Sequence, residues 1–128
     1  MTLLYDVFVI GKPKAQPRPK AARIGNYIRI YTPDTAKEWR QRIKNTFLCV
    51  RRSSQITEPC KADIDFYFKG KGQGFFSKRP DVDNLAKAVF DALTEIGIWK
   101  DDSLICDSRL KKYSGKQEGA AIRIYSLA

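Results

Sequence analysis

The sequence predicts a single α+β domain, in which a mixed β-sheet and two main helices form one compact unit. Its 128 residues suffice for one hydrophobic core but not for two. Runs of strand-forming residues alternate with two stretches whose apolar residues recur every three or four positions. Together they give the order β-β-α-β-α-β-β, which is typical of an α+β fold.

The N-terminal part is expected to supply two strands joined by an irregular segment. Residues 3–10, LLYDVFVI, and residues 27–31, YIRIY, are rich in strand-forming side chains. Between them, residues 12–23 contain three prolines, so no regular element is expected there. This segment is either a solvated loop or an arm that lies along phosphates. Its candidate DNA contacts are Lys12, Lys14, Arg18, Lys20 and Arg23.

An amphipathic helix is expected over residues 33–50. Thr32 suits the N-cap, and Pro33 suits the first helical position. Apolar residues from Ala36 to Val50 recur at helical spacing, and basic side chains occupy the other face. The apolar stripe is expected to pack on the core, whereas the basic face serves either solubility or binding.

A strand and a glycine-rich loop follow. Residues 62–68, ADIDFYF, alternate apolar and polar side chains as a half-buried strand does. The loop at residues 69–79 combines three glycines with basic residues and two adjacent phenylalanines. These phenylalanines either stack on exposed bases or attach the loop to the core or to a partner subunit. The candidate DNA contacts in this loop are Lys69, Lys71, Phe75, Phe76, Lys78 and Arg79.

The C-terminal part is expected to contain one helix and two strands. The apolar stripe from Leu85 to Ile96 predicts a helix over residues 83–96, which Gly97 ends. Residues 103–113 and 120–127 are predicted to be strands joined by a glycine-containing turn.

Composition restricts the possible chemistry. A count of 24 Lys and Arg against 14 Asp and Glu gives a formal charge of +10, which favours a polyanionic partner. The absence of histidine excludes Ser/His/Asp and Cys/His triads as well as Cys₂His₂ zinc fingers. Cys49, Cys60 and Cys106 are odd in number and scattered, so they are expected to be reduced, mostly buried thiols.

The N-terminus does not have the pattern of a secretory signal. It lacks a basic first region and a small-residue cleavage site, and Asp6 interrupts its apolar run. No stretch of the sequence approaches the roughly 20 apolar residues that a membrane-spanning helix needs. The expectation is a soluble, cytoplasmic protein.

Acidic residues gather around the helix at 83–96, although the chain is basic. Asp81 and Asp83 open this helix, and Asp101 and Asp102 lie in the turn after it. Each pair has an ordinary interpretation, as helix caps or as exposed turn residues. The helix is about 20 Å long, so the pairs meet only if the following segment folds back along it. Three converging aspartates without histidine would then suit Mg²⁺ and not zinc.

A lysine shares one face of the same helix with two carboxylates. Lys87 lies one turn after Asp83 and one turn before Asp91. The arrangement is either a pair of weak surface ion pairs or a cation directed at a phosphate beside the metal.

These residues resemble the signature of the RusA family of Holliday junction resolvases, which is found in bacteria and their prophages. The D-x-D-N opening at Asp81, the lysine four residues after Asp83, the F-D-A-L run and the closing G-x-W-x-D-D all agree. The element order and the basic, proline-rich N-terminal segment agree more loosely.

The resemblance implies a homodimeric, Mg²⁺-dependent endonuclease that nicks four-way DNA junctions symmetrically in recombination and repair, with Mn²⁺ expected to substitute. It assigns metal binding and catalysis to Asp81, Asp83 and Asp102, and a catalytic role to Lys87. Supporting roles are expected for Asn84, Asp91 and Asp101.

Two other functions remain open. One is a nuclease that acts on forks or flaps, and the other is a junction-binding protein whose acidic cluster is only structural. A two-fold dimer would match the symmetry of a four-way junction and present two sites. Phe75, Phe76 and Trp99 are the candidate anchors of its interface.

Overall fold

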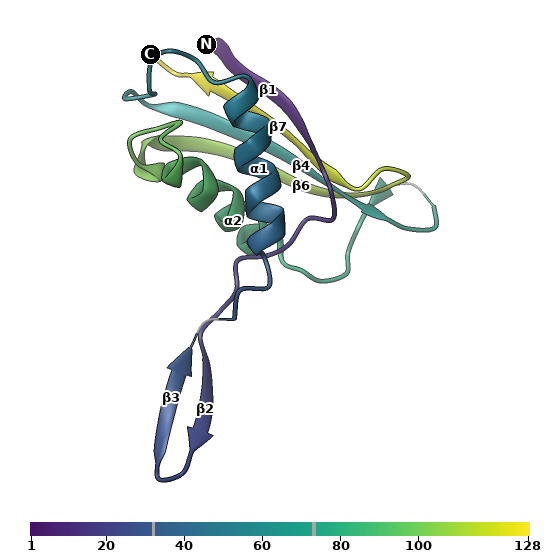
Figure 1. The fold of residues 1–128 in the computed structure, drawn as a ribbon. Helices are drawn as coiled ribbons and strands as arrows, with labels where there is room; N and C mark the ends of the chain where they lie inside the picture. Colours follow the sequence, from purple (N-terminus) through teal and green to yellow (C-terminus); the bar gives the residue numbers. More distant parts are fainter. Residues whose placement is uncertain (32, 73) are drawn as a thin grey trace.

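The computed structural model describes residues 1–31, 33–72 and 74–128, and these form a five-stranded sheet, a separate two-stranded hairpin and two α-helices (Figure 1). The five-stranded sheet has the order β1-β7-β4-β6-β5. β4 and β6 run parallel, whereas the other neighbours are antiparallel. The predicted α+β class with a mixed sheet is therefore confirmed. The strands are β1 (Thr2–Ile10), β4 (Cys60–Lys69), β5 (Gly74–Phe75), β6 (Ile105–Gly115) and β7 (Gly119–Ser126).

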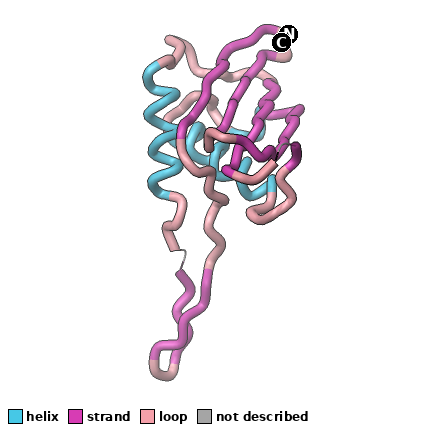
Figure 2. Tube along the Cα trace, turned by 90° about the vertical axis from the view of Figure 1, so that its right-hand side faces the viewer, coloured by secondary structure: helices cyan, strands magenta, loops and turns pink. Residues whose placement is uncertain are grey.

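Both helices, α1 (Lys37–Cys49) and α2 (Val82–Glu95), pack on the same face of the sheet (Figures 1 and 2). Their buried side chains recur at the predicted helical spacing, and every second residue of β4 is buried beneath them. The core forms between these two layers. Its largest fully buried side chains include Phe47, Phe66, Leu85, Leu93 and Trp99.

The hairpin consists of β2 (Lys20–Ile24) and β3 (Tyr27–Tyr31) and extends away from the sheet and the helices (Figures 1 and 2). Its strands meet at a two-residue turn, where Gly25 has a φ of 60°. The prediction of no regular element over residues 12–23 is therefore wrong from Lys20 onward. Pro19 is the last proline of the segment, and the residues after it again have backbone N–H groups to donate.

Helix α1 begins later than predicted. Its first helical hydrogen bond runs from Arg40 N to Ala36 O, so Pro33 lies before the helix instead of at its first position. Arg40 also donates to the carboxylate of Asp34 at 2.7 Å, which holds the preceding turn against the helix. The predicted N-cap, Thr32, lies outside the described residues.

The two C-terminal strands are joined by a short connection but are not neighbours. β4 lies between β6 and β7, because residues 116–118 cross over the end of β4. The parallel pairing of β6 with β4 places the start of β6 beside the start of β4, with Ile105 opposite Cys60. This register determines where the residues around α2 lie.

Two sequence-based expectations about side chains are wrong. Trp99 is fully buried and donates its indole N–H to Thr94 Oγ1 at 2.7 Å, so it belongs to the core and cannot anchor a subunit interface. Of the three cysteines only Cys60 is buried, and this burial raises the pKa of its thiol. Cys49 and Cys106 are exposed, and all three thiols are free. In the described part of the chain, no helix is long and apolar enough to cross a membrane.

Candidate active site at the start of α2

Two predicted site residues lie together at the N-terminus of α2. Asp81 occupies the N-cap position with an extended backbone, and its carbonyl accepts a hydrogen bond from Leu85 N at 3.1 Å. Its side chain makes no capping hydrogen bond, so the carboxylate is not used to stabilise the helix. Asp83 lies in the first helical turn, and both side chains are exposed. The positive end of the helix favours two carboxylates here and leaves them available to a ligand.

Asp101 and Asp102 lie at the other end of the helix. They begin the short 3₁₀ turn η1 (Asp102–Leu104), which leads directly into β6. Asp101 occupies its N-cap position, and hydrogen bonding with Ser103 lowers the pKa of the Asp101 carboxyl. The ordinary interpretation as a turn residue therefore fits Asp101.

The structure separates the two acidic pairs within one chain. Lys112 of β6 donates to Pro80 O, immediately before Asp81, whereas Asp102 lies three residues before the start of β6 at Ile105. Seven residues of β-strand separate Ile105 from Lys112, a distance of about 23 Å. β6 does fold back along α2, as Figure 1 shows, but the return brings Lys112 to the start of the helix and leaves Asp102 at its end. The predicted convergence of three aspartates is wrong for a single chain.

The carboxylates fit a metal ion only in part. Over residues 1–31, 33–72 and 74–128, no group of three or more Asp, Glu or Cys side chains is close enough to hold one. Mg²⁺ is, however, usually bound by one or two carboxylates together with water and phosphate oxygens. Asp81 and Asp83, both exposed and only two residues apart at the first turn of α2, fit that smaller ligand set. Asp102 could join the same ion only from a second subunit.

One interpretation of Lys87 predicted ion pairs with Asp83 and Asp91, and the pair with Asp91 is present. Lys87 Nζ lies 3.6 Å from Asp91 Oδ1, and the two side chains are 60% and 30% exposed. Such an exposed pair contributes little to stability, so Lys87 can exchange this partner for another anion at small cost. Lys87 lies one turn after Asp83 on the same helix.

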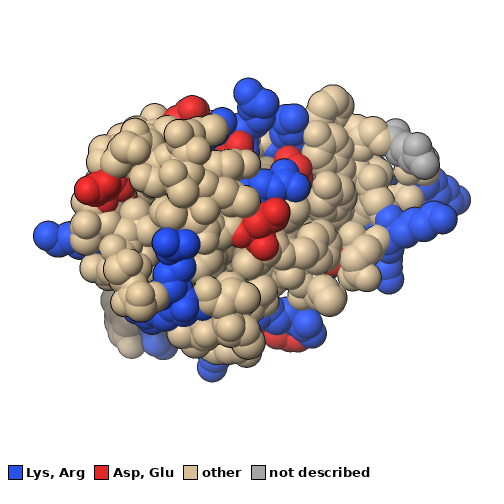
Figure 3. Space-filling model, turned by 90° about the horizontal axis from the view of Figure 1, so that it is seen from above, with Lys and Arg blue, Asp and Glu red and all other residues tan. Residues whose placement is uncertain are grey.

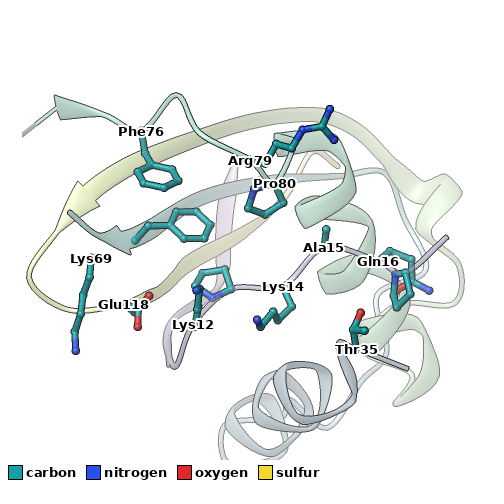
Figure 4. A pocket seen from close by; sticks show the side chains of 13 residues that line it. Lys12, Lys14, Ala15, Gln16, Thr35, Lys69, Phe76, Arg79, Pro80 and Glu118 are labelled. Atoms are coloured by element: carbon teal, nitrogen blue, oxygen red, sulfur yellow. The ribbon is translucent and has the colours of Figure 1, made fainter. Parts of the chain in front are cut away.

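The basic N-terminal segment is attached next to the acidic pair. Gln16 N donates to Asn84 O at 3.0 Å, which ties the segment to the first turn of α2. Beside this contact lies a cavity of about 750 Å³, with Lys12 and Lys14 on one side and Arg79 on the other (Figure 4). Of the predicted DNA contacts, the residues that line it are Lys12, Lys14, Lys69, Phe76 and Arg79. A cavity with four cations and one carboxylate, Glu118, suits a phosphate.

The two loop phenylalanines have different environments. Phe76 stacks on the buried Phe68, with 4.6 Å between ring centroids, so it attaches the loop to the core. Phe75 is 75% exposed and stacks on Tyr113 on the opposite face of the sheet. Of the two rings, Phe75 is the more accessible to a base or a partner subunit, because Phe76 is partly buried.

Comparison with known proteins identifies the family. The family model described as Endodeoxyribonuclease RusA matches residues 11–125, nearly the whole chain. The chain belongs to the RusA family. It is also similar to the uncharacterized protein YqaN of Bacillus subtilis, with 28% identity over 131 residues that cover 91% of this chain and 92% of the relative.

A second relative is closer in sequence over a shorter range. The crossover junction endodeoxyribonuclease RusA of Escherichia coli strain K12 is 54% identical over 70 residues, or 55% of this chain. The same identity is found with the RusA of Shigella sonnei. The alignment spans half the length of each of these RusA relatives.

In this RusA-family chain, the sequence pattern did not identify Lys112 as a residue of the site. Its ammonium donates to the backbone carbonyls of Lys78 and Pro80, both at 2.8 Å, and lies 5.9 Å from the centre of the Phe76 ring. Lys112 thereby fixes the segment that leads into Asp81. Strand alternation could have indicated this role, because it puts Lys112 on the helix-covered face of β6 together with Leu110.

Lys112→Met should lower the rate of DNA cleavage several-fold and leave DNA affinity nearly unchanged. The substitution keeps the aliphatic stem but removes two charge-assisted hydrogen bonds, each of about 1.5–3 kcal/mol, that hold the backbone before Asp81. Single-turnover cleavage and equilibrium binding would be measured in parallel. The control is Lys111→Met on the uncovered face of the same strand, and equal effects of both variants would contradict this role.

Proposed function

We propose that the chain is an endodeoxyribonuclease that resolves four-way DNA junctions by paired nicks. The main support is the 54% identity to a relative named crossover junction endodeoxyribonuclease, together with membership of the RusA family. The position of the acidic pair agrees with this function, because Asp81 and Asp83 lie beside a basic cavity that suits a phosphate. A basic protein that attracts DNA would then hold its carboxylates where the strand is cut.

Each group at this site has a distinct proposed part. The cations around the cavity, Lys12, Lys14 and Arg79, bind the DNA backbone and position a phosphate near α2. Lys87, released from its weak pair with Asp91, neutralises charge that develops on the scissile phosphate. Asp81 and Asp83 would hold Mg²⁺, or Mn²⁺ in its place, and the bound ion would activate a water and stabilise the charge on the leaving oxygen.

The biological setting is proposed on the same basis. Resolution of a junction belongs to DNA recombination and repair, and it requires nicks on two opposing strands. A homodimer presents two such sites in a two-fold arrangement. Asp102 is kept as a proposed metal ligand, and the distance from Asp81 then requires that it acts across the subunit interface. Asn84 has a supporting part through its backbone, which anchors the basic segment.

One experiment separates this function from its alternatives. A four-way junction, a fork, a flap and a linear duplex of related sequence would be incubated with the protein, with and without Mg²⁺. Paired symmetric nicks in the junction alone, only with Mg²⁺, are the expected result. Equal cleavage of forks or flaps would support the broader structure-selective nuclease, and binding without any cleavage would support the non-catalytic junction-binding protein.

Lys87→Ala should lower the cleavage rate more than the DNA affinity. A cation that acts on charge developing in the transition state does not need to contribute to ground-state binding. Single-turnover rates at saturating protein, compared with dissociation constants in EDTA, measure the two effects separately. A variant that loses affinity but keeps its single-turnover rate would make Lys87 a phosphate anchor only. Glu95→Gln on the same helix serves as the control, because Glu95 pairs with Lys44 at its far end.

A further inference from the structure

The β2–β3 hairpin is the part of the molecule least explained by its own fold. Its strands of five residues each form a ribbon about 16 Å long, at 3.3 Å per residue. None of the described residues 20–31 belongs to the hydrophobic core. Because an isolated two-stranded hairpin is only marginally stable in water, this ribbon is expected to be ordered by a partner.

The ribbon exposes apolar side chains that a monomer would normally bury. Ile28 is 68% exposed and Ile30 is 74% exposed. Cross-strand pairing puts them on one face with Ala21 and Arg23, since Ile30 lies opposite Ala21 and Ile28 opposite Arg23. The other face carries Ile24, Tyr27, Arg29 and the remaining paired side chains. A paired, exposed isoleucine surface indicates a binding site.

The charge of this region identifies the kind of partner. Residues 7–33 contain no Asp or Glu, and their cations are Lys12, Lys14, Arg18, Lys20, Arg23 and Arg29. Elsewhere the signs are mixed, and the face seen from above carries basic and acidic side chains side by side (Figure 3). A second copy of this chain also has a charge of +10, and its hairpin offers no carboxylate to these cations. A polyanion with accessible apolar surface is complementary to both features.

The segment that leads into the hairpin is attached at the candidate active site. The contact between Gln16 N and Asn84 O is four residues before the start of β2 and one residue from Asp83. The ribbon is longer than the major groove of a DNA duplex is wide, about 12 Å. A DNA strand held at Asp81 and Asp83 therefore has its neighbouring duplex within reach of the ribbon.

We propose that the β2–β3 hairpin recognises the branch point of the DNA, and this inference rests on the proposed function. Ile28 and Ile30 pack against base faces that are exposed where the paired strands separate. Lys20, Arg23 and Arg29 hold the surrounding phosphates. In a linear duplex the base faces are stacked and inaccessible, so only the phosphate contacts remain. The hairpin thus discriminates branched from linear DNA, whereas the cavity beside α2 binds any strand.

The test is equilibrium binding in EDTA, which separates recognition from cleavage. The double variant Ile28→Thr with Ile30→Thr keeps the β-branched shape that favours a strand and removes the apolar surface. Its affinity for a four-way junction should fall about tenfold or more, and its affinity for a linear duplex of the same sequence should stay within about twofold. Leu48→Thr is the matched control, because Leu48 is 48% exposed and lies at the C-terminal end of α1, the end of the helix that Figure 1 shows farther from the hairpin. Arg29→Gln should weaken binding of both DNAs in parallel.

Each other outcome overturns the inference. An equal loss of affinity for junction and duplex would reduce the hairpin to a general DNA-binding arm. No loss for either would remove Ile28 and Ile30 from the DNA contact. A change in the sedimentation coefficient of the free double variant would assign the ribbon to a contact between subunits. A wild-type protein that binds both DNAs equally would overturn the proposed junction function as well, which distinguishes that failure from one confined to the hairpin.

Discussion

Asp81→Asn and Asp83→Asn are each expected to abolish DNA cleavage while leaving junction binding intact or stronger. Each substitution removes a carboxylate from the exposed pair at the start of α2 and keeps the shape of the side chain. The loss of a metal-binding charge should leave under about a tenth of the wild-type rate. Loss of negative charge beside the basic cavity also reduces repulsion of phosphates, so affinity should not fall. Single-turnover cleavage of a labelled junction and binding in EDTA measure the two quantities.

The matched control for this pair is Asp6→Asn. Asp6 is an exposed aspartate on β1, at the opposite edge of the sheet from β6 and β5. The same chemical change there should leave cleavage unaffected. Since Asp81 makes no capping hydrogen bond through its side chain, its substitution should lower the melting temperature only slightly, through the loss of a favourable charge at the helix N-terminus. A variant of Asp81 or Asp83 that still cuts at more than about a tenth of the wild-type rate would remove that residue from the catalytic set.

Asp102→Asn tests, through the same assays, whether the third proposed aspartate takes part in cleavage. The structure places Asp102 about a helix length from Asp81 within one chain, so any effect on cleavage depends on how subunits assemble. Loss of cleavage with intact folding would support a ligand supplied across an interface, and wild-type activity would remove Asp102 from the site.

The elements predicted correctly from the sequence are those whose apolar pattern depends on residues close together along the chain. The alternation in β4 and the apolar stripe of α2 follow directly from which side chains face the core, so both elements lie close to where they were expected. The positions of Asp81, Asp83 and Lys87 on this helix and its N-cap were predicted for the same reason, and their catalytic roles stay predictions.

The features that were missed depend on contacts between distant parts of the chain. Local pattern cannot show that β4 separates β6 from β7, and this register sends Lys112 instead of Asp102 to the start of α2. Trp99 lies next to an exposed turn in sequence, but its indole fills the core beside Thr94. The β2 strand was not predicted, because the prolines before it indicated an irregular segment, although its partner β3 was predicted.

Mixed dimers of wild-type and Asp81→Asn subunits are expected to nick one strand of a four-way junction and then stall. One chain carries one acidic pair at α2, whereas resolution requires two cuts on opposing strands. A two-fold dimer supplies the second site and doubles the formal charge to +20 (10 + 10). Because Trp99 is buried and Phe76 is packed on Phe68, Phe75 is the predicted interface anchor that remains exposed. Sedimentation at micromolar concentration would establish the dimer, and differently tagged subunits would allow mixed dimers to be purified. A nicked junction that persists agrees with two coupled sites, and a monomer that makes both cuts would contradict the dimeric mechanism.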